Sequence, residues 1–229
     1  MGEKKKKEAG VKMRYKILTI IACVFFAAVM ILSGMGSGWI SALRAVQPGD
    51  AVTVQITVNG ASGDPLLTSD QALYQKQTAA NQGLFYAKDL VITANQSSPG
   101  SLYPVPVYSA ANGWSDSFAL FSSEYDMISE ALVGMKVNEQ KTIALPSADS
   151  MTETWSAEQL QTQGVNLTDI HVGDQLSMAV SSNSQLEKNA SKSSYSVRIG
   201  EVTAKSADGV TIKFGYPTIA IKVLKISTG

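Results

Sequence analysis

Apolar and polar residues alternate from Ala51 to Val58, and this period of two predicts a strand with one buried face. A second pattern follows the short apolar segment from Phe118 to Phe121, which also predicts a strand. After it, apolar residues recur at the helical spacing i, i+3, i+4 and i+7, at Ile128, Ala131, Leu132 and Met135. This stripe predicts a short helix with one face on a hydrophobic core.

Local residues also predict where this helix begins and ends. Ser122 and Ser123 have side chains that can cap a helix N-terminus, and Asp126 completes a box-like arrangement with the second serine. Gly134 stands where a left-handed helix end needs a residue without a Cβ. The residues from Lys141 to Leu145 then alternate as a strand does. Together these signals predict a strand–helix–turn–strand unit.

The end of this unit carries a resemblance to a known family. Residues 130–146 read EALVGMKVNEQKTIALP, which resembles the segment Glu-Ala-Leu-x-Gly-Met-x-Val-Gly-Glu-x-Lys-Thr of FKBP-type peptidyl-prolyl isomerases. Asn138 stands at a glycine of that pattern, and Asn adopts left-handed conformations more readily than other residues with a side chain. Residues 47–58 are similar to the family's first strand, and residues 219–226 to its last. The resemblance implies an α+β fold, an antiparallel sheet with one helix packed across it.

A longer segment separates two parts of this predicted core. In compact members of the family, the strand that ends at Pro146 leads directly to the last strand, whereas here residues 147–213 intervene. They contain alternating segments separated by turn residues, which predict a small β-rich module. Their order resembles the inserted flap domain of SlyD-type isomerases. The resemblance therefore implies an FKBP-like core over 45–146 and 214–229, with an inserted flap domain over 147–213.

The N-terminal region differs in kind from the rest. Residues 1–16 are mostly charged and basic, and residues 17–43 carry no charge, a length that exceeds the roughly 20 apolar residues of a membrane span. The excess of positive charge before this span predicts an N-terminus inside the cell. A cleaved signal peptide is the alternative, because small residues follow residue 32. We expect a basic cytoplasmic tail over 1–16, a single transmembrane helix over 17–43 and an extracytoplasmic domain at the cell membrane.

Charge and composition exclude several kinds of chemistry. From Ala45 onward the chain holds 11 Lys and Arg against 17 Asp and Glu, and this acidic excess argues against binding of nucleic acid, which requires a basic surface. Cys23 is the only cysteine, so no disulfide framework is possible. The sequence has no catalytic Ser/His/Asp set, no metal-binding spacing and no phosphate-binding loop. We therefore expect neither a metal nor a cofactor.

Prolyl isomerisation requires only an apolar, water-poor pocket that binds the twisted amide, because the barrier arises from amide resonance. The resemblance implies eight substrate-binding positions, with no catalytic residue assigned: Ile56, Leu66, Leu67, Phe118, Tyr125, Ile128, Met151 and Ile219. Two family aromatics are replaced, since Ile128 stands for the Trp at the pocket base and Met151 for the flap Tyr. The family's pocket Asp falls at Leu67. Simple packing in the core is the alternative interpretation of each position.

The resemblance predicts a peptidyl-prolyl isomerase and folding chaperone that acts on unfolded or proline-containing exported polypeptides at the outer face of the membrane. The pocket substitutions leave open a second function, a non-catalytic FKBP-like module for peptide binding or scaffolding. The segment from Tyr103 to Tyr108 is held extended by two prolines. Its two tyrosines indicate either a peptide-docking surface or an edge segment packed on the sheet.

Overall fold

The computed structural model describes residues 19–27, 29–31, 33, 44–80, 84–109, 113–180 and 196–227. The chain divides into two compact units, residues 1–44 and residues 45–229. In the first unit the described residues from 19 to 33 are helical. The predicted tail over 1–16 lies outside the described residues.

No helix within the described ranges combines the length with the apolar character that a membrane crossing demands. This finding contradicts the predicted transmembrane helix over 17–43, and with it the predicted location of a single-pass protein at the cell membrane. The prediction counted residues without charge, but the run includes Ser33–Gly38, which consists of Ser, Gly and one Met. Because Gly disfavours helix by about 1 kcal/mol relative to Ala, absence of charge overestimates the length of an apolar helix.

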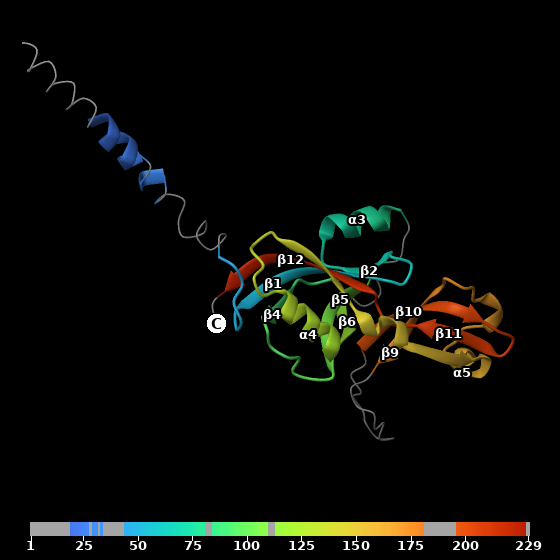
Figure 1. Ribbon diagram of the computed structural model, residues 1–229. Helices are drawn as coiled ribbons and strands as arrows, with labels where there is room; N and C mark the ends of the chain where they lie inside the picture. The colour runs from blue at the N-terminus through green and yellow to red at the C-terminus, as the bar shows by residue number, and fades with distance from the viewer. Residues whose placement is uncertain are drawn as a thin grey trace, which may run out of the picture. The chain divides into compact units, whose positions relative to one another are not determined.

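A single sheet runs through the second unit (Figure 1), with strands in the order β7-β12-β1-β2-β3-β5-β6-β10-β11-β8, while β4 pairs with β1 and β9 with β10. The strands are β1 (Ala51–Asn59), β2 (Pro65–Thr68), β3 (Phe85–Ala87), β4 (Leu90–Thr93), β5 (Leu102–Ser109), β6 (Gly113–Phe121), β7 (Gln140–Ala144), β8 (Thr152–Ser156), β9 (Gln175–Val180), β10 (Ser196–Lys205), β11 (Gly209–Lys213) and β12 (Thr218–Ser227). The helices of this unit are α3 (Gln71–Ala79), α4 (Ser122–Ala131) and α5 (Ala157–Thr162), with short 3₁₀ turns η1 (Pro146–Ser150) and η2 (Leu167–Asp169).

The sheet is mixed and curled, so the prediction of an antiparallel sheet is wrong. Strand β2 pairs with β3 in parallel, and β6 pairs with β10 in parallel. Helix α3 connects β2 to β3, as expected of a crossover between parallel neighbours. Strands β6 and β10 lie far apart in the sequence. The parallel pair of β6 and β10 is therefore not visible in the local pattern.

Strand β1 is central to the fold. It pairs with β12 along its whole length, and on its other side with β4 near its start and β2 near its end. Ile56 lies between the part of β1 that pairs with β4 and the part that pairs with β2, and there Ser69 hydrogen-bonds to the backbone of β1. Its Oγ accepts from the Ile56 amide at 2.9 Å, and its own amide donates to the Ile56 carbonyl at 2.9 Å. Residues of β1 alternate between buried and half-buried, as predicted.

The strand–helix–turn–strand unit is confirmed in its main features. Helix α4 begins directly after β6, and its stripe residues Ile128 and Leu132 are buried. Gly134 and Asn138 both adopt positive φ, at 85° and 68°, as their positions require. The predicted serine cap is wrong: Phe121 is the N-cap residue, and its amide donates to the Glu124 carboxylate at 2.9 Å.

The buried apolar side chains form two clusters. The larger includes Tyr125 and Ile128 of α4 together with buried residues of β1 and β12. The smaller draws only on the predicted insert, from Leu160, Ile170, Met178, Val202, Val210 and Ile212. Strand β10 contributes to both, because Ile199 belongs to the larger cluster and Val202 to the smaller. Strand β8, which pairs with β11, was not predicted. Separate folding of residues 147–213 stays a prediction.

Candidate functional site

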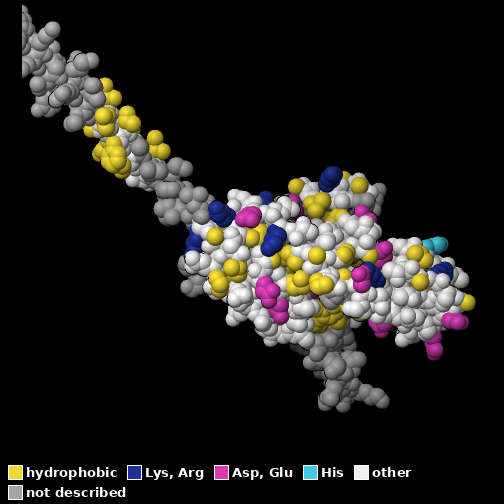
Figure 2. Space-filling view, in the orientation of Figure 1, with side chains coloured by type: hydrophobic (Ala, Val, Ile, Leu, Met, Phe, Trp, Pro, Cys, Tyr) yellow, Lys and Arg dark blue, Asp and Glu magenta, His cyan; other side chains and the backbone are white. Residues whose placement is uncertain are grey.

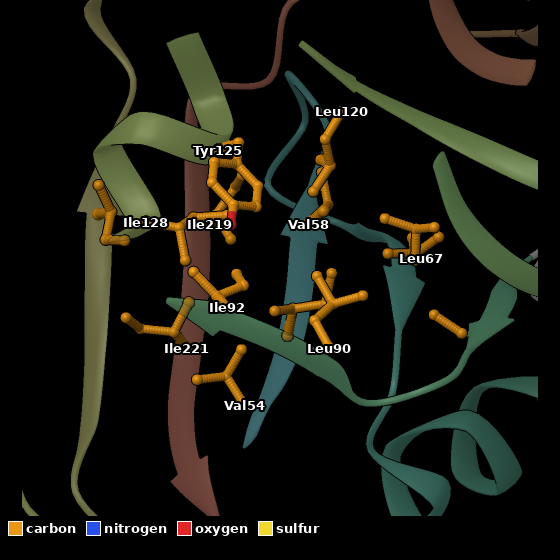
Figure 3. Packing of buried hydrophobic residues seen from close by; sticks show 14 of the residues in the cluster. Val54, Val58, Leu67, Leu90, Ile92, Leu120, Tyr125, Ile128, Ile219 and Ile221 are labelled. Carbon is orange, nitrogen blue, oxygen red and sulfur yellow. The ribbon is translucent and has the colours of Figure 1, made fainter. Parts of the chain in front are cut away.

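Seven of the eight predicted pocket residues come together in the larger cluster: Ile56, Leu66, Leu67, Phe118, Tyr125, Ile128 and Ile219. Figure 3 shows Tyr125 and Ile128 pointing from α4 toward Ile219 and Ile92. Ile128 is 0% exposed and Tyr125 is 5% exposed. In this structure these positions belong to one packed cluster, and each is at most 5% exposed.

The eighth residue, Met151, lies apart from this cluster. It stands between η1 and β8, where it is half-buried. Its backbone carbonyl accepts a hydrogen bond of 3.0 Å from the Phe214 amide. Met151 therefore helps join the start of the insert to its end, and it does not complete a pocket with the other seven.

A buried ion pair connects α4 with β10. Arg198 is 0% exposed, and its two terminal nitrogens donate to the two carboxylate oxygens of Glu124 at 2.9 and 2.5 Å. The guanidinium also donates to the carbonyls of Ala119 at 2.9 Å and Phe214 at 2.7 Å. A buried charge is tolerated when it is paired and hydrogen-bonded in this way. These contacts of Arg198 join four segments: β6, α4, β10 and Phe214, the residue that follows β11.

Aromatic rings enclose this ion pair. The guanidinium carbon of Arg198 lies 4.1 Å from the ring centroids of both Phe121 and Tyr216. The Tyr216 hydroxyl accepts from the Ile199 amide and donates to the Ile199 carbonyl, each at 3.1 Å. Burial raises the pKa of Tyr216, and the nearby positive charge of Arg198 opposes this shift. Because the groups are buried and mutually bonded, we assign this network a structural role.

A second group of aromatic residues lies at the surface. Tyr74 of α3, Tyr86 of β3, Tyr108 of β5 and Trp114 of β6 form a continuous row, which we call the aromatic face. The ring centroids are 4.9 Å apart for Tyr74 and Tyr86, 5.7 Å for Tyr86 and Trp114, and 5.6 Å for Tyr108 and Trp114. Trp114 is 42% exposed and Tyr108 is 40% exposed.

The alternation of β5 explains how these rings reach the surface. Val105 and Val107 are buried, while Pro104, Pro106 and Tyr108 are exposed on the opposite side of the strand. Tyr86 is paired with Tyr108 across β3 and β5, so their side chains share this outer side. The register of the β5–β6 pair shifts between Val107 and Ser109, and Trp114 lies in the corresponding interval of β6. Four elements thus bring their rings to one face of the sheet.

A positive charge belongs to the aromatic face. Lys88 Nζ lies 5.0 Å from the Trp114 ring centroid, a distance typical of cation–π contacts. The Lys88 amide donates to the Pro106 carbonyl at 3.1 Å, which fixes this lysine beside β5. Figure 2 shows a basic side chain beside apolar surface in the region of α3.

The two tyrosines singled out in the sequence separate in the structure. Tyr103 faces inward, where its ring centroid lies 4.7 Å from that of Tyr125, whereas Tyr108 belongs to the aromatic face. Strand β5 lies between β3 and β6, so it is not an edge strand. The sequence thus identified one member of the aromatic face. Alternation within β5 could have separated the two tyrosines, but the neighbouring rings come from segments distant along the chain.

The insert carries a cleft of about 270 Å³ between β8 and α5, lined by Glu153, Trp155, Gln159, Thr162 and Gln163. Two of these polar side chains already form hydrogen bonds to the backbone at α5. The Gln159 side-chain oxygen accepts from the Ser156 amide at 2.8 Å, and the Thr162 hydroxyl donates to the Glu158 carbonyl at 2.9 Å. The cleft therefore offers fewer polar groups to a ligand than its lining indicates.

Comparison of the chain with models of known protein families and with curated proteins finds no match. Among the described residues, no group of three or more His, Cys, Asp and Glu side chains is arranged to hold a metal ion. The closed cluster under α4 and the aromatic face, with its exposed Tyr108 and Trp114, are therefore the two features that bear on function.

Proposed function

We propose that this chain is a non-catalytic polypeptide-binding module, which binds extended apolar and proline-containing segments without isomerising them. The observation that carries the proposal is the burial of the positions that would line an isomerase pocket. Ile56, Phe118, Ile128 and Ile219 are each 0% exposed. Catalysis would require that a prolyl ring and its twisted amide reach these side chains.

Opening a pocket at this place would carry a large energetic cost. Exposing a buried Ile or Phe side chain costs roughly 1.5–3 kcal/mol, and several such residues pack together here. Tyr125 and Ile128 also lie on α4, which the Glu124–Arg198 pair fixes to β10. A prolyl substrate would have to offset these terms before any isomerisation.

Isomerase activity is the alternative, and the resemblance of residues 130–146 to the FKBP-type pattern favours it. The two functions differ in one assay, the refolding of a protein whose slow phase is limited by a prolyl bond. Uncatalysed isomerisation takes tens to hundreds of seconds, so even weak acceleration is measurable.

We expect the full chain to leave this slow phase unchanged, even in molar excess over the refolding protein. In parallel, it should reduce the aggregation of the same protein when that protein is diluted from denaturant. An acceleration proportional to the concentration of the chain would establish the isomerase instead. Failure in both assays would remove polypeptide binding as the function.

A further inference from the structure

The aromatic face is suited to contact with another molecule because Tyr108 and Trp114 are exposed, Tyr74 and Tyr86 are half-buried, and the rings are tilted. The interplanar angles are 33° between Tyr74 and Tyr86, 53° between Tyr86 and Trp114, and 61° between Tyr108 and Trp114. The neighbouring rings contact one another, and their tilt turns their outer surfaces in different directions. A flat platform would require rings that lie nearly in one plane.

We infer that the aromatic face binds a short, extended, proline-rich peptide segment that carries an acidic residue. This inference rests on the proposed function and gives it a place on the molecule and a class of ligand. Proline-rich segments adopt the polyproline II conformation before they bind, and they dock into grooves lined by aromatic side chains. A pyrrolidine ring would stack on the exposed surface of Tyr108 or Trp114, because rings whose centroids are 4.9–5.7 Å apart leave no room for another ring between them.

The size of the row sets the length of the segment. The three centroid separations of 4.9, 5.7 and 5.6 Å limit the row to about 16 Å. Polyproline II rises about 3.1 Å per residue, so about five residues would cover the row. Shorter peptides should therefore bind more weakly, and extension beyond this length should add little affinity.

The positive charge of Lys88 indicates that the peptide should carry an acidic residue. Lys88 lies over the Trp114 ring and is fixed beside β5 by its backbone hydrogen bond to Pro106. A carboxylate on the peptide would gain a charge-assisted contact with this ammonium group. The chain's own basic segment, residues 1–16, has the wrong sign for this place.

The test uses the full chain and a fluorescent peptide of five prolines preceded by one glutamate. We expect saturable binding, weakened roughly tenfold or more by Trp114→Ala and less strongly by Tyr108→Ala, because Trp and Tyr anchors carry most of the affinity at such sites. The same peptide with alanine in place of each proline should bind far more weakly. Val172→Ala, which truncates an exposed apolar residue of the insert, is the matched control and should leave the dissociation constant unchanged.

A charge exchange tests the second half of the inference. Lys88→Glu should weaken the glutamate-containing peptide severalfold, while a peptide with lysine in place of that glutamate should regain affinity for the Lys88→Glu variant. Altered folding of the Lys88→Glu variant would weaken the binding of both peptides equally. The charge exchange therefore distinguishes a direct contact from altered folding.

Each other outcome overturns a different statement. Equal binding of the glutamate peptide by the wild-type chain and Trp114→Ala places the binding elsewhere, and the proposed function then stands without this site. Lack of binding to any peptide, together with no effect on aggregation, removes the proposed function itself. Trp114-dependent binding of a tetrasaccharide of N-acetylglucosamine, without peptide binding, would make the aromatic face a carbohydrate site.

Discussion

The aromatic residues of this protein occupy two contrasting regions. Under α4, Phe118 and Tyr216 are at most 1% exposed, and their rings fill space within a closed cluster. On the aromatic face, Tyr108 and Trp114 keep about 40% of their surface in contact with solvent. The same kind of side chain thus serves packing in one region and remains available for contact in the other. The accessible rings of the aromatic face are the basis of the proposed binding function.

The two regions also differ in how they are held. The cluster under α4 is tied by a buried ion pair and by hydrogen bonds between distant segments. The aromatic face is held by ring contacts, and α3, which supplies Tyr74, has no buried residue. Substitutions should therefore cost much stability in the first region and little in the second.

The largest effect is expected for Arg198→Ala. This change leaves the Glu124 carboxylate buried without its partner, and breaking a buried pair in this way costs about 3–5 kcal/mol. The free energy of unfolding from urea titration measures the loss. The double variant Arg198→Met with Glu124→Gln should lose less, because it removes both buried charges. A loss below 1 kcal/mol for Arg198→Ala would show that the ion pair does not hold this region together.

Ile128→Ala should follow in magnitude. A truncated isoleucine in a close-packed core costs about 2–5 kcal/mol, and Ile128 is 0% exposed. Leu132→Ala, on the same face of α4 and equally buried, is the reference and should lose a similar amount. If Ile128→Ala costs much less than Leu132→Ala in the same titration, the position faces an open pocket and the contrast drawn here fails.

Tyr216 predicts a dependence of stability on alkaline pH. Because burial raises its pKa above the ordinary value of 10.0, Tyr216 keeps its proton in the folded state where the unfolded chain loses it. The unfolded state then binds fewer protons, so the free energy of unfolding falls as pH rises above 10, by up to about 1.4 kcal/mol per pH unit. Below pH 10 this contribution to stability is complete.

The variant Tyr216→Phe isolates this effect. Burial also raises the pKa of Tyr103 and Tyr125, and both residues remain in the variant. Urea titrations between pH 9 and 11 should therefore give a shallower decline for Tyr216→Phe than for the wild-type chain. Parallel declines would mean that Tyr216 titrates equally in the folded and unfolded states.

The smallest effect on stability is expected on the aromatic face. Trp114→Ser removes ring contacts and a cation–π contact at an exposed site, each worth about 0.5–1.5 kcal/mol at most, and exposure offsets part of this loss. We expect a change of about 1 kcal/mol or less in the free energy of unfolding. A loss as large as that of Ile128→Ala would make Trp114 a structural residue.

Some of these features could be predicted from the sequence because they depend on neighbours in the chain. The stripe of Ile128 and Leu132, the positive φ of Gly134 and the alternation of β1 are local, and the structure confirms each. The serine cap failed because two signals compete at the same helix start. The Glu124 carboxylate reaches the Phe121 amide, and the helix begins accordingly.

Other features depend on contacts between distant segments, which a local pattern does not contain. Glu124 and Arg198 are 74 positions apart, and nothing near either residue indicates that they pair. The parallel pair of β6 and β10 also joins segments that are distant in the sequence. The aromatic face combines rings from four elements, so only Tyr108 was identified in advance. The predicted pocket residues were brought together, but burial, which decides whether a ligand reaches them, depends on the whole packed cluster.

The most direct test of this account is the chemical-shift change of backbone amides when the five-proline peptide with its glutamate is added to the isotope-labelled full chain. We expect the largest changes in β3, β5 and the start of β6, at Tyr86, Tyr108 and Trp114, with little change at Ile128 and Ile219. Large changes at Tyr125, Ile128 and Ile219, with none at Trp114, would place the peptide under α4 and contradict the account.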